Sequence, residues 1–146
     1  KFAPDGTHLL TFGGRGDGAG KFTSPRSVAV DAEGRIYVGL GDDFLIQRFA
    51  PDGSYLDAFG NAYADESAWR IGGVAVDASG NVYATQALSA RVQCFTAPGF
   101  ALGWEMGKVG AGEDGLVSPL GLTVAGDQLI VVDQGNHRLK RYTLQP

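Results

Sequence analysis

The chain has 146 residues, 44% of them hydrophobic, and a formal net charge of −4, which suits one globular domain with a packed core. The acidic balance disfavours nucleic-acid binding, because Lys and Arg contacts to phosphate supply most of that affinity. No apolar run approaches the roughly 18 residues of a membrane span, so membrane insertion is not expected. A single cysteine, Cys94, excludes an internal disulfide and is expected to be a small buried residue.

Glycine accounts for 23 of the 146 residues, more than twice the usual share of about 7%. This composition favours many tight turns and therefore many short strands. No segment offers about ten residues of helical periodicity with caps at both ends, so the fold class is predicted to be all-β. The chain begins at Lys1 without an initiator Met, which indicates an excised or processed piece. The compartment stays open, with an extracytoplasmic or secreted location favoured.

A repeat runs along the chain. The segments PRSVAVDAEGRIYV, IGGVAVDASGNVYA and PLGLTVAGDQLIVV align so that Val28, Val74 and Leu122 are equivalent, 46 and 48 residues apart. An aromatic strand leading into a Pro-Gly turn recurs as KFAPDG, RFAPDG and CFTAPG. A third landmark ends each unit: Phe12-Gly13, Phe59-Gly60 and Met106-Gly107, each 47 residues apart. A period of about 40–50 residues is typical of propeller blades with four strands each.

The first complete repeat predicts four antiparallel strands, at 27–31, 35–39, 45–50 and 55–59, with turns at 32–34 and 51–53. The units are predicted at 24–60, 70–107 and 118–146, with residues 1–13 ending an earlier blade and supplying its outer strand, 7–12. The chain is thus predicted to hold about three blades, half of a six-bladed ring.

The last unit carries a family signature. Asn136-His137-Arg138-Leu139, preceded by Asp133, resembles the motif that names the NHL repeat, and the resemblance covers essentially the whole chain. It implies a disc, usually of six blades, whose innermost strands line a central channel. Relatives of this kind include the RNA- or protein-binding propellers of tripartite-motif ubiquitin ligases and sensor domains of bacterial kinases. Propellers of similar architecture are lyases and lactonases with metals at the channel mouth.

The resemblance also implies an Asp-to-Arg pair inside a blade, which only the third unit can form. The other two units are expected either to rely on apolar packing or to have been reshaped for binding. The residues equivalent to Asp133, Asn136 and Arg138 are Leu40, Asp43 and Leu45 in the first unit, and Gln86, Ser89 and Arg91 in the second.

Several short motifs are weak signals. Residues 110–115 match GxGxxG, but a strand is expected after them and not the helix that a dinucleotide site needs. Arg15-Gly16-Asp17 spells a cell-adhesion tripeptide in a loop whose equivalent, residues 109–111, does not preserve it. The turns 31–34 and 77–80 hold too few carboxylates for calcium.

Catalysis has little support. The two histidines, His8 and His137, are too few for a propeller metal site or a serine triad. The carboxylate pairs Asp42-Asp43 and Asp65-Glu66 lie in loops, where solvation is expected. No catalytic residue, metal ligand or cofactor is therefore predicted, and the chain is not expected to be an enzyme.

The connection 61–70 departs from the repeat. The other connections between blades are rich in glycine and end in Ser-Pro, whereas this one lacks both glycine and proline. It contains Tyr, Trp and Arg, the residue types that are enriched at binding hot spots. Two interpretations stay open: the aromatic residues anchor a ligand, or they fill the space between two blades. The candidate binding residues are Tyr63, Asp65, Glu66, Trp69 and Arg70.

The leading functional hypothesis is a non-enzymatic propeller that binds a protein, peptide or glycan on the loop face around residues 61–70. The alternatives are half of a metal-dependent lyase or hydrolase of streptogramin-lyase-like architecture, and an RNA-binding propeller, which the acidic charge disfavours. Three blades do not close a ring, so the expected partner is a second copy of the chain, with residues 7–12 of one copy completing the last blade of the other. The rest of a longer parent chain would serve the same purpose.

Overall fold

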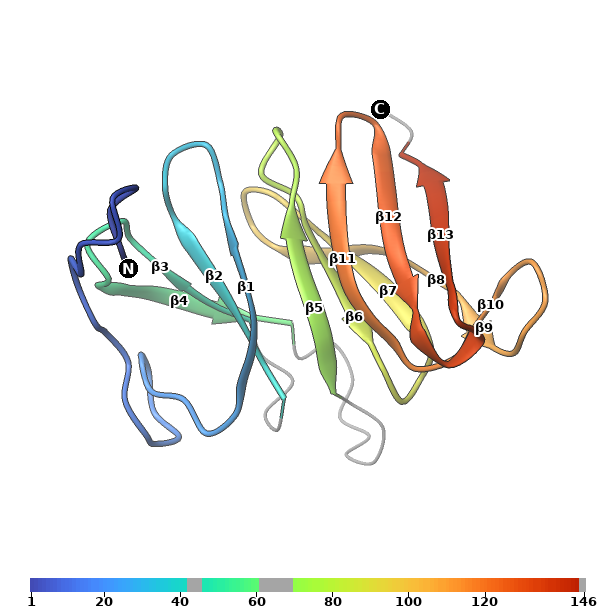
Figure 1. The fold of residues 1–146 in the computed structure, drawn as a ribbon, viewed down its shortest axis with the longest axis horizontal. Coiled ribbons are helices and arrows are strands. Elements are labelled where there is room, and N and C mark those ends of the chain that lie inside the picture. The colour runs from blue at the N-terminus through green and yellow to red at the C-terminus, as the bar shows by residue number, and fades with distance from the viewer. Residues whose placement is uncertain (42–45, 61–69, 145–146) are drawn as a thin grey trace.

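The computed structural model describes residues 1–41, 46–60 and 70–144, and the fold is all-β as predicted. Two four-stranded antiparallel sheets and one three-stranded antiparallel sheet follow each other along the chain (Figure 1). We call them blades 1, 2 and 3. Within the described ranges the only helical element is a three-residue 3-10 turn, η1 (Gln134–Asn136), and no helix has the length and apolarity that a membrane crossing needs.

The strands of each blade are hydrogen-bonded in chain order. Blade 1 consists of β1 (Pro25–Val30), β2 (Ile36–Leu40), β3 (Ile46–Phe49) and β4 (Tyr55–Phe59). Blade 2 consists of β5 (Ile71–Val76), β6 (Val82–Gln86), β7 (Arg91–Thr96) and β8 (Ala101–Met106). A short parallel ladder of β9 (Lys108–Val109) and β10 (Gly115–Leu116) precedes blade 3, which consists of β11 (Pro119–Ala125), β12 (Gln128–Asp133) and β13 (Arg138–Thr143).

Two of the three core clusters among the described residues lie between blades, and the third packs blade 1 against the N-terminal segment. Tyr37 and Ile46 of blade 1 face blade 2, and the equivalent Tyr83 and Val92 of blade 2 face blade 3. These four side chains are at most 3% exposed. Because a single sheet cannot enclose its own apolar side chains, each blade depends on its neighbours for burial.

The inner strands β1, β5 and β11 lie side by side (Figure 1). Between blades 1 and 2, the Val74 N–H donates to Ser27 Oγ at 2.9 Å. Between blades 2 and 3 the backbones approach more closely, because Gly73 takes the repeat position of Ser27. A Cβ at Gly73 would lie 2.7 Å from the carbonyl oxygen of Leu120, which is closer than two such atoms can approach.

Residues 7–12 differ from the prediction, because they form no strand. The backbone pairs with the chain start only through the Phe2–His8 bridge and neighbouring hydrogen bonds, such as that from the Leu9 N–H to the Lys1 carbonyl at 2.9 Å. A strand forms only along a partner, and the described residues pair with 7–12 at these few positions alone. Phe12 nevertheless packs on Phe49 with ring centroids 5.0 Å apart. The equivalent Phe59 packs on Phe95 in the same way, at 5.5 Å.

The close approach at Gly73 generates a test of the inner-strand packing. We expect Gly73→Ala to lower the free energy of unfolding by about 1–3 kcal/mol, because its methyl group would press on the backbone of β11. Urea denaturation followed by tryptophan fluorescence measures the change.

The matched control is Gly121→Ala on β11. A Cβ there would have Val132 Cγ2 as its nearest neighbour, at an ordinary 3.8 Å. This variant should be neutral or slightly stabilising, since alanine restricts the unfolded chain. Equal losses in the two variants would contradict the backbone clash at Gly73.

Candidate functional site

One end of the blades carries the connections 13–24 and 107–118 together with the turns 87–90 and 134–137 (Figure 1). We call this end the loop face. The hydrogen bonds from the Ala87 N–H to the Arg70 carbonyl and from Asn136 Nδ2 to the Gly110 carbonyl show that turns inside blades meet connections between blades here. The loop face therefore carries both Arg70, one of the predicted binding residues, and the NHL-like motif.

The two described connections share one geometry. The Gly16 N–H donates to the Phe22 carbonyl at 3.2 Å, and the Gly110 N–H donates to the Leu116 carbonyl at 3.0 Å. Their opening glycines adopt left-handed backbone angles that L-residues avoid, with φ of +95° and +97° (Gly13 and Gly107).

This geometry accounts for two of the weak motifs. Residues 110–115 lead into β10 and β11, so no helix N-terminus follows to hold a pyrophosphate. The glycines of the pattern serve the backbone conformation of the connection. Arg15 pairs in parallel with Phe22, as Val109 pairs with Leu116. The tripeptide 15–17 thus lies in a repeated structural loop, with Arg15 and Asp17 exposed.

Asp133 is fully buried at the end of β12, and three donors surround its carboxylate. The Val117 N–H donates to Oδ1 at 2.7 Å, while Asn136 Nδ2 and Arg138 Nε donate to Oδ2 at 2.9 and 2.7 Å. The ion pair expected inside the third unit is therefore present. Burial raises the pKa of Asp133, but these hydrogen bonds and the Arg138 charge outweigh it and hold the pKa below its usual range.

The same side chains tie the connection 107–118 to blade 3. Arg138 Nη2 donates to the carbonyls of Gly112 and Gly115 at 2.9 and 3.1 Å. Lys140 Nζ donates to the Gly115 carbonyl at 2.8 Å. His137, the middle letter of the motif, is exposed and adopts a left-handed φ of +53°, so its described role is in the backbone turn.

Blades 1 and 2 lack the Asp-Arg pair, and different side chains take its place in each. In blade 1, Leu40 is 1% exposed and packs with Phe49, as the apolar interpretation proposed. In blade 2 a buried amide network replaces the carboxylate: Gln86 Nε2 donates to Gln93 Oε1 at 2.7 Å, and Ser89 Oγ donates to Gln86 Oε1 at 2.8 Å. The expected apolar packing is therefore wrong at the Asp133-equivalent position of blade 2, where hydrogen-bonded amides take its place.

Sequence reasoning missed the repeat position shared by Gln47, Gln93 and Lys140. Gln47 accepts from the Gly20 N–H and donates to the Lys21 carbonyl, both at 2.9 Å. Gln47 thus ties the connection 13–24 to blade 1, as Lys140 ties its equivalent to blade 3. The available signal was a long polar side chain that recurs at one repeat position of the third strands.

Four of the predicted binding residues, Tyr63, Asp65, Glu66 and Trp69, lie outside the described residues. Arg70 is described and exposed. Its carbonyl accepts from the Ala87 N–H at 3.0 Å, and the Ser24 carbonyl accepts from the Gly41 N–H at 2.8 Å in the equivalent place. Gly60 opens this connection with a φ of +111°, close to the glycines that open the other two. The connection is thus anchored at both ends in the repeat geometry.

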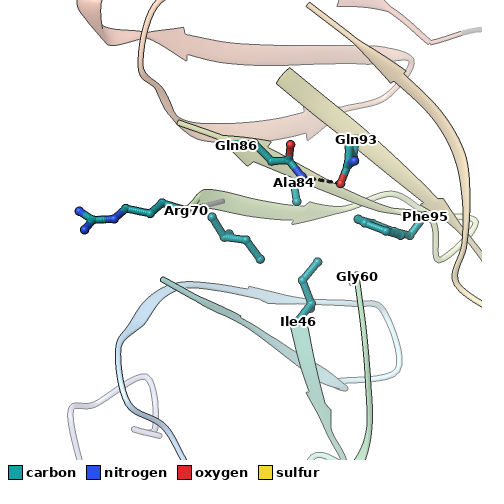
Figure 2. Close-up of a pocket in the computed structure, with 8 residues that line it drawn as sticks. Ile46, Gly60, Arg70, Ala84, Gln86, Gln93 and Phe95 are labelled. Atoms are coloured by element: carbon teal, nitrogen blue, oxygen red, sulfur yellow. Dashed lines mark hydrogen bonds between the residues drawn. The ribbon is translucent and has the colours of Figure 1, made fainter. Parts of the chain in front are cut away.

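A small cavity lies beside this connection, between blades 1 and 2 (Figure 2). Its volume of about 10 Å³ suits one water molecule at most. Figure 2 shows Arg70 directed away from Ile46 and Phe95, which form part of the apolar wall. The cavity is therefore a packing gap and too small for a ligand.

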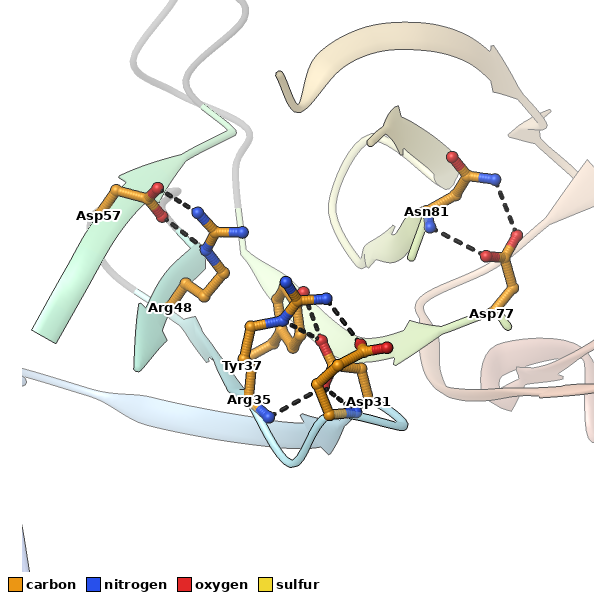
Figure 3. A network of polar contacts seen from close by, with 8 residues as sticks. Asp31, Arg35, Tyr37, Arg48, Asp57, Asp77 and Asn81 are labelled. Carbon is orange, nitrogen blue, oxygen red and sulfur yellow. Dashed lines mark hydrogen bonds and ion pairs between the residues drawn. The ribbon is translucent and has the colours of Figure 1, made fainter. Parts of the chain in front are cut away.

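The aspartates considered for calcium have other partners (Figure 3). Asp31 Oδ2 accepts from Arg35 Nε at 2.6 Å and from the Tyr37 hydroxyl at 3.0 Å. Asp77 Oδ2 accepts from Asn81 Nδ2 and from the Tyr83 hydroxyl, both at 2.9 Å. These side-chain hydrogen bonds close the turns between the first and second strands, at the end of the blades opposite the loop face (Figure 1).

The remaining reactive side chains do not assemble into a site. Among residues 1–41, 46–60 and 70–144, no three His, Cys, Asp or Glu side chains lie close enough to hold a metal ion. His8 is exposed, with Nε2 2.9 Å from Thr11 Oγ1. Asp42 and Asp43 lie outside the described residues. Burial raises the pKa of the Cys94 thiol to about 11, so it stays protonated near neutral pH.

The Asp133 network generates a stability prediction. Arg138→Leu leaves a fully buried carboxylate without its cation and frees two loop carbonyls, so we expect the free energy of unfolding to fall by about 2 kcal/mol. Urea denaturation measures the loss. Arg15→Leu, which changes an exposed arginine of the equivalent connection 13–24, should stay within about 0.5 kcal/mol of the parent. Equal stability of the two variants would contradict the structural role of the pair.

The lowered pKa of Asp133 predicts a pH dependence. Because the folded pKa lies below the unfolded value of about 3.9, the stabilisation is complete above that value and is lost as the pH falls through the folded pKa. Asp133→Asn removes this titration. We expect its unfolding free energy to be lower at pH 7 and to change less than that of the parent between about pH 4 and pH 2, as chemical denaturation at each pH measures. Parallel pH profiles would refute the assignment.

No family model matches the chain. Among curated proteins, the E3 ubiquitin-protein ligase TRIM71 of Rattus norvegicus is 46% identical over 50 residues, which are 34% of this chain and 6% of that protein. Among solved structures, one chain of a nidogen/laminin complex matches with a TM-score of 0.65 and 20% identity, over 84% of this chain and 44% of that one.

A catalytically inactive virginiamycin B lyase from Staphylococcus aureus with quinupristin matches with a TM-score of 0.60 and 14% identity, over 84% of this chain and 42% of that one. A streptogramin B lyase matches with a TM-score of 0.59 and 17% identity, over 80% of this chain and 39% of that one. The chain thus spans less than half the length of each of these structures. At these identities the likeness shows the fold, and the three sheets are blades of a β-propeller.

Proposed function

We propose that the chain is part of an NHL-type binding propeller that takes a protein, peptide or glycan on its loop face, without chemistry of its own. One observation carries the proposal. The connection between blades 1 and 2 is anchored at Gly60 and Arg70 like the other connections, yet its sequence contains Tyr63, Asp65 and Trp69 where those are rich in glycine. Anchoring that is kept while the residues between the anchors change is typical of a binding loop on a rigid scaffold.

The rest of the loop face supports this role. Gln47 fixes one connection, and Asp133, Arg138 and Lys140 fix another, so their backbones are ordered before a partner arrives. Preorganised loops lose less entropy on binding. Tyr, Trp and Arg are enriched among the few residues that provide most of the binding energy at protein interfaces, and all three occur within residues 61–70.

A lyase or hydrolase is the second candidate, because two of the similar structures are lyases. We favour binding because the described residues contain no convergent group of His, Cys, Asp or Glu. Metal analysis of the purified chain separates the two, since stoichiometric bound metal would favour the enzyme. For RNA binding, the discriminating result is oligonucleotide affinity that falls steeply with salt.

The proposal predicts that Tyr63→Ala combined with Trp69→Ala weakens binding by about 2 kcal/mol or more, roughly 30-fold in Kd, if both side chains are anchors. The probes are peptides selected from a phage-displayed library on the parent chain and glycans captured from an array. Isothermal titration calorimetry measures each Kd, and thermal unfolding measures stability.

The matched control is Tyr55→Ala combined with Trp104→Ala, which removes the same residue types from the outer strands β4 and β8, where they are 38% and 37% exposed. Its binding should equal that of the parent. If instead the Tyr63 and Trp69 variant unfolds or loses stability with unchanged affinity per folded molecule, the two aromatic residues pack between the blades and the proposal fails.

A further inference from the structure

The outer surface of blade 3 has the pattern of a face between two blades. Leu139 is 68% exposed and Val132 is 37% exposed on the face turned away from blade 2. Leu139 takes the repeat position of Ile46 in blade 1 and Val92 in blade 2, which are both 0% exposed against a neighbouring blade. The described residues place nothing on this face, which has the composition of a buried one.

Blade 1 presents the complementary half of such an interface. Val28 and Val30 of β1 are 64% and 57% exposed on the face turned away from blade 2. The equivalent Val74 and Val76 of β5 pack into the interface between blades 1 and 2. Residues of the N-terminal segment cover part of this face of blade 1. The two outer faces carry the same two surfaces that this chain already joins twice, between blades 1 and 2 and between blades 2 and 3.

The free edge of β13 has a matching strand in the same sequence. β3 and β7 each pair with a fourth strand, with Ile46 opposite Phe59 and Val92 opposite Met106. Among the described residues β13 pairs only with β12. Residues 7–12 have the repeat position of β4 and β8, and the repeat register sets Phe12 opposite Leu139 and Leu10 opposite Arg141. The two termini lie at opposite ends of the row of blades, so this segment does not reach β13 of its own chain (Figure 1).

We propose that β13 and the open face of blade 3 bind residues 7–12 and blade 1 of a second copy of this chain. The contact joins two different surfaces, and such contacts close into a ring when the rotation between copies allows it. Two copies related by a two-fold axis form the contact twice, and each then supplies the fourth strand of the other's blade 3.

Light scattering on the 146-residue chain tests the association. The expected mass is twice 15.3 kDa. Leu139→Asp should raise the dimer dissociation constant at least tenfold while leaving the fold intact, because this side chain is exposed within one copy. The control is Leu88→Asp, on an exposed turn of blade 2 that touches neither open face; it should remain dimeric. A folded monomer for the parent chain, or equal effects of the two variants, would overturn the proposal.

A cysteine pair tests the strand that is donated. Leu10→Cys with Arg141→Cys places two thiols opposite each other in the expected register, within the Cα separation of about 4.5–5.5 Å that a disulfide spans. Oxidation should give a covalent dimer, while the buried Cys94 does not compete. His8→Cys with Arg141→Cys is the control, two residues out of register, and should cross-link poorly. A dimer that the first pair does not cross-link, or that both pairs cross-link equally, would refute the strand exchange.

Discussion

Burial between neighbouring sheets is the constraint on which the rest of this structure depends. Each blade has apolar side chains on both faces, and a lone sheet leaves them in water. Ile46, Tyr37 and Val92 reach 0% exposure only because the next blade covers them. The burial that stabilises the fold thus occurs mainly at the junctions between blades. The sequence repeat therefore preserves the contact between two blades more than the single sheet.

Polar side chains set the geometry of those junctions. Every described connection between blades leaves backbone groups without partners in a strand, and a long polar side chain from the third strand of the following blade satisfies some of them. Gln47 does this with an amide, and Lys140 and Arg138 do it with cations supported by Asp133. One structural task is therefore solved with different chemistry in successive blades, which explains why the signature residues occur together only in blade 3.

The sequence predicted the strands well because several landmarks agreed on one period, so an error at one of them would have shown at the others. It predicted the Asp133–Arg138 pair because both residues belong to a recognisable motif five residues apart. It did not predict the hydrogen bonds of Asp31 with Tyr37 and of Asp77 with Tyr83, because the two aspartates were already explained as turn residues. The bond from Gln47 to the connection 13–24 was equally hidden, because it joins residues 26 positions apart. The strand expected at 7–12 does not form, because a sequence pattern shows only which residues favour a strand, whereas a strand also needs a neighbouring segment to pair with.

The unequal inner-strand contacts limit how this repeat array can be rearranged during evolution. The junction of blades 1 and 2 uses the Ser27 hydroxyl, while the junction of blades 2 and 3 uses the absence of a side chain at Gly73. A copy of blade 1 placed directly before blade 3 would set the Cβ of Ser27 where Gly73 now meets the Leu120 carbonyl oxygen, and the two atoms would clash. The units are therefore similar in sequence but not interchangeable in order, and a new blade enters such an array only together with the junction residues of its neighbour.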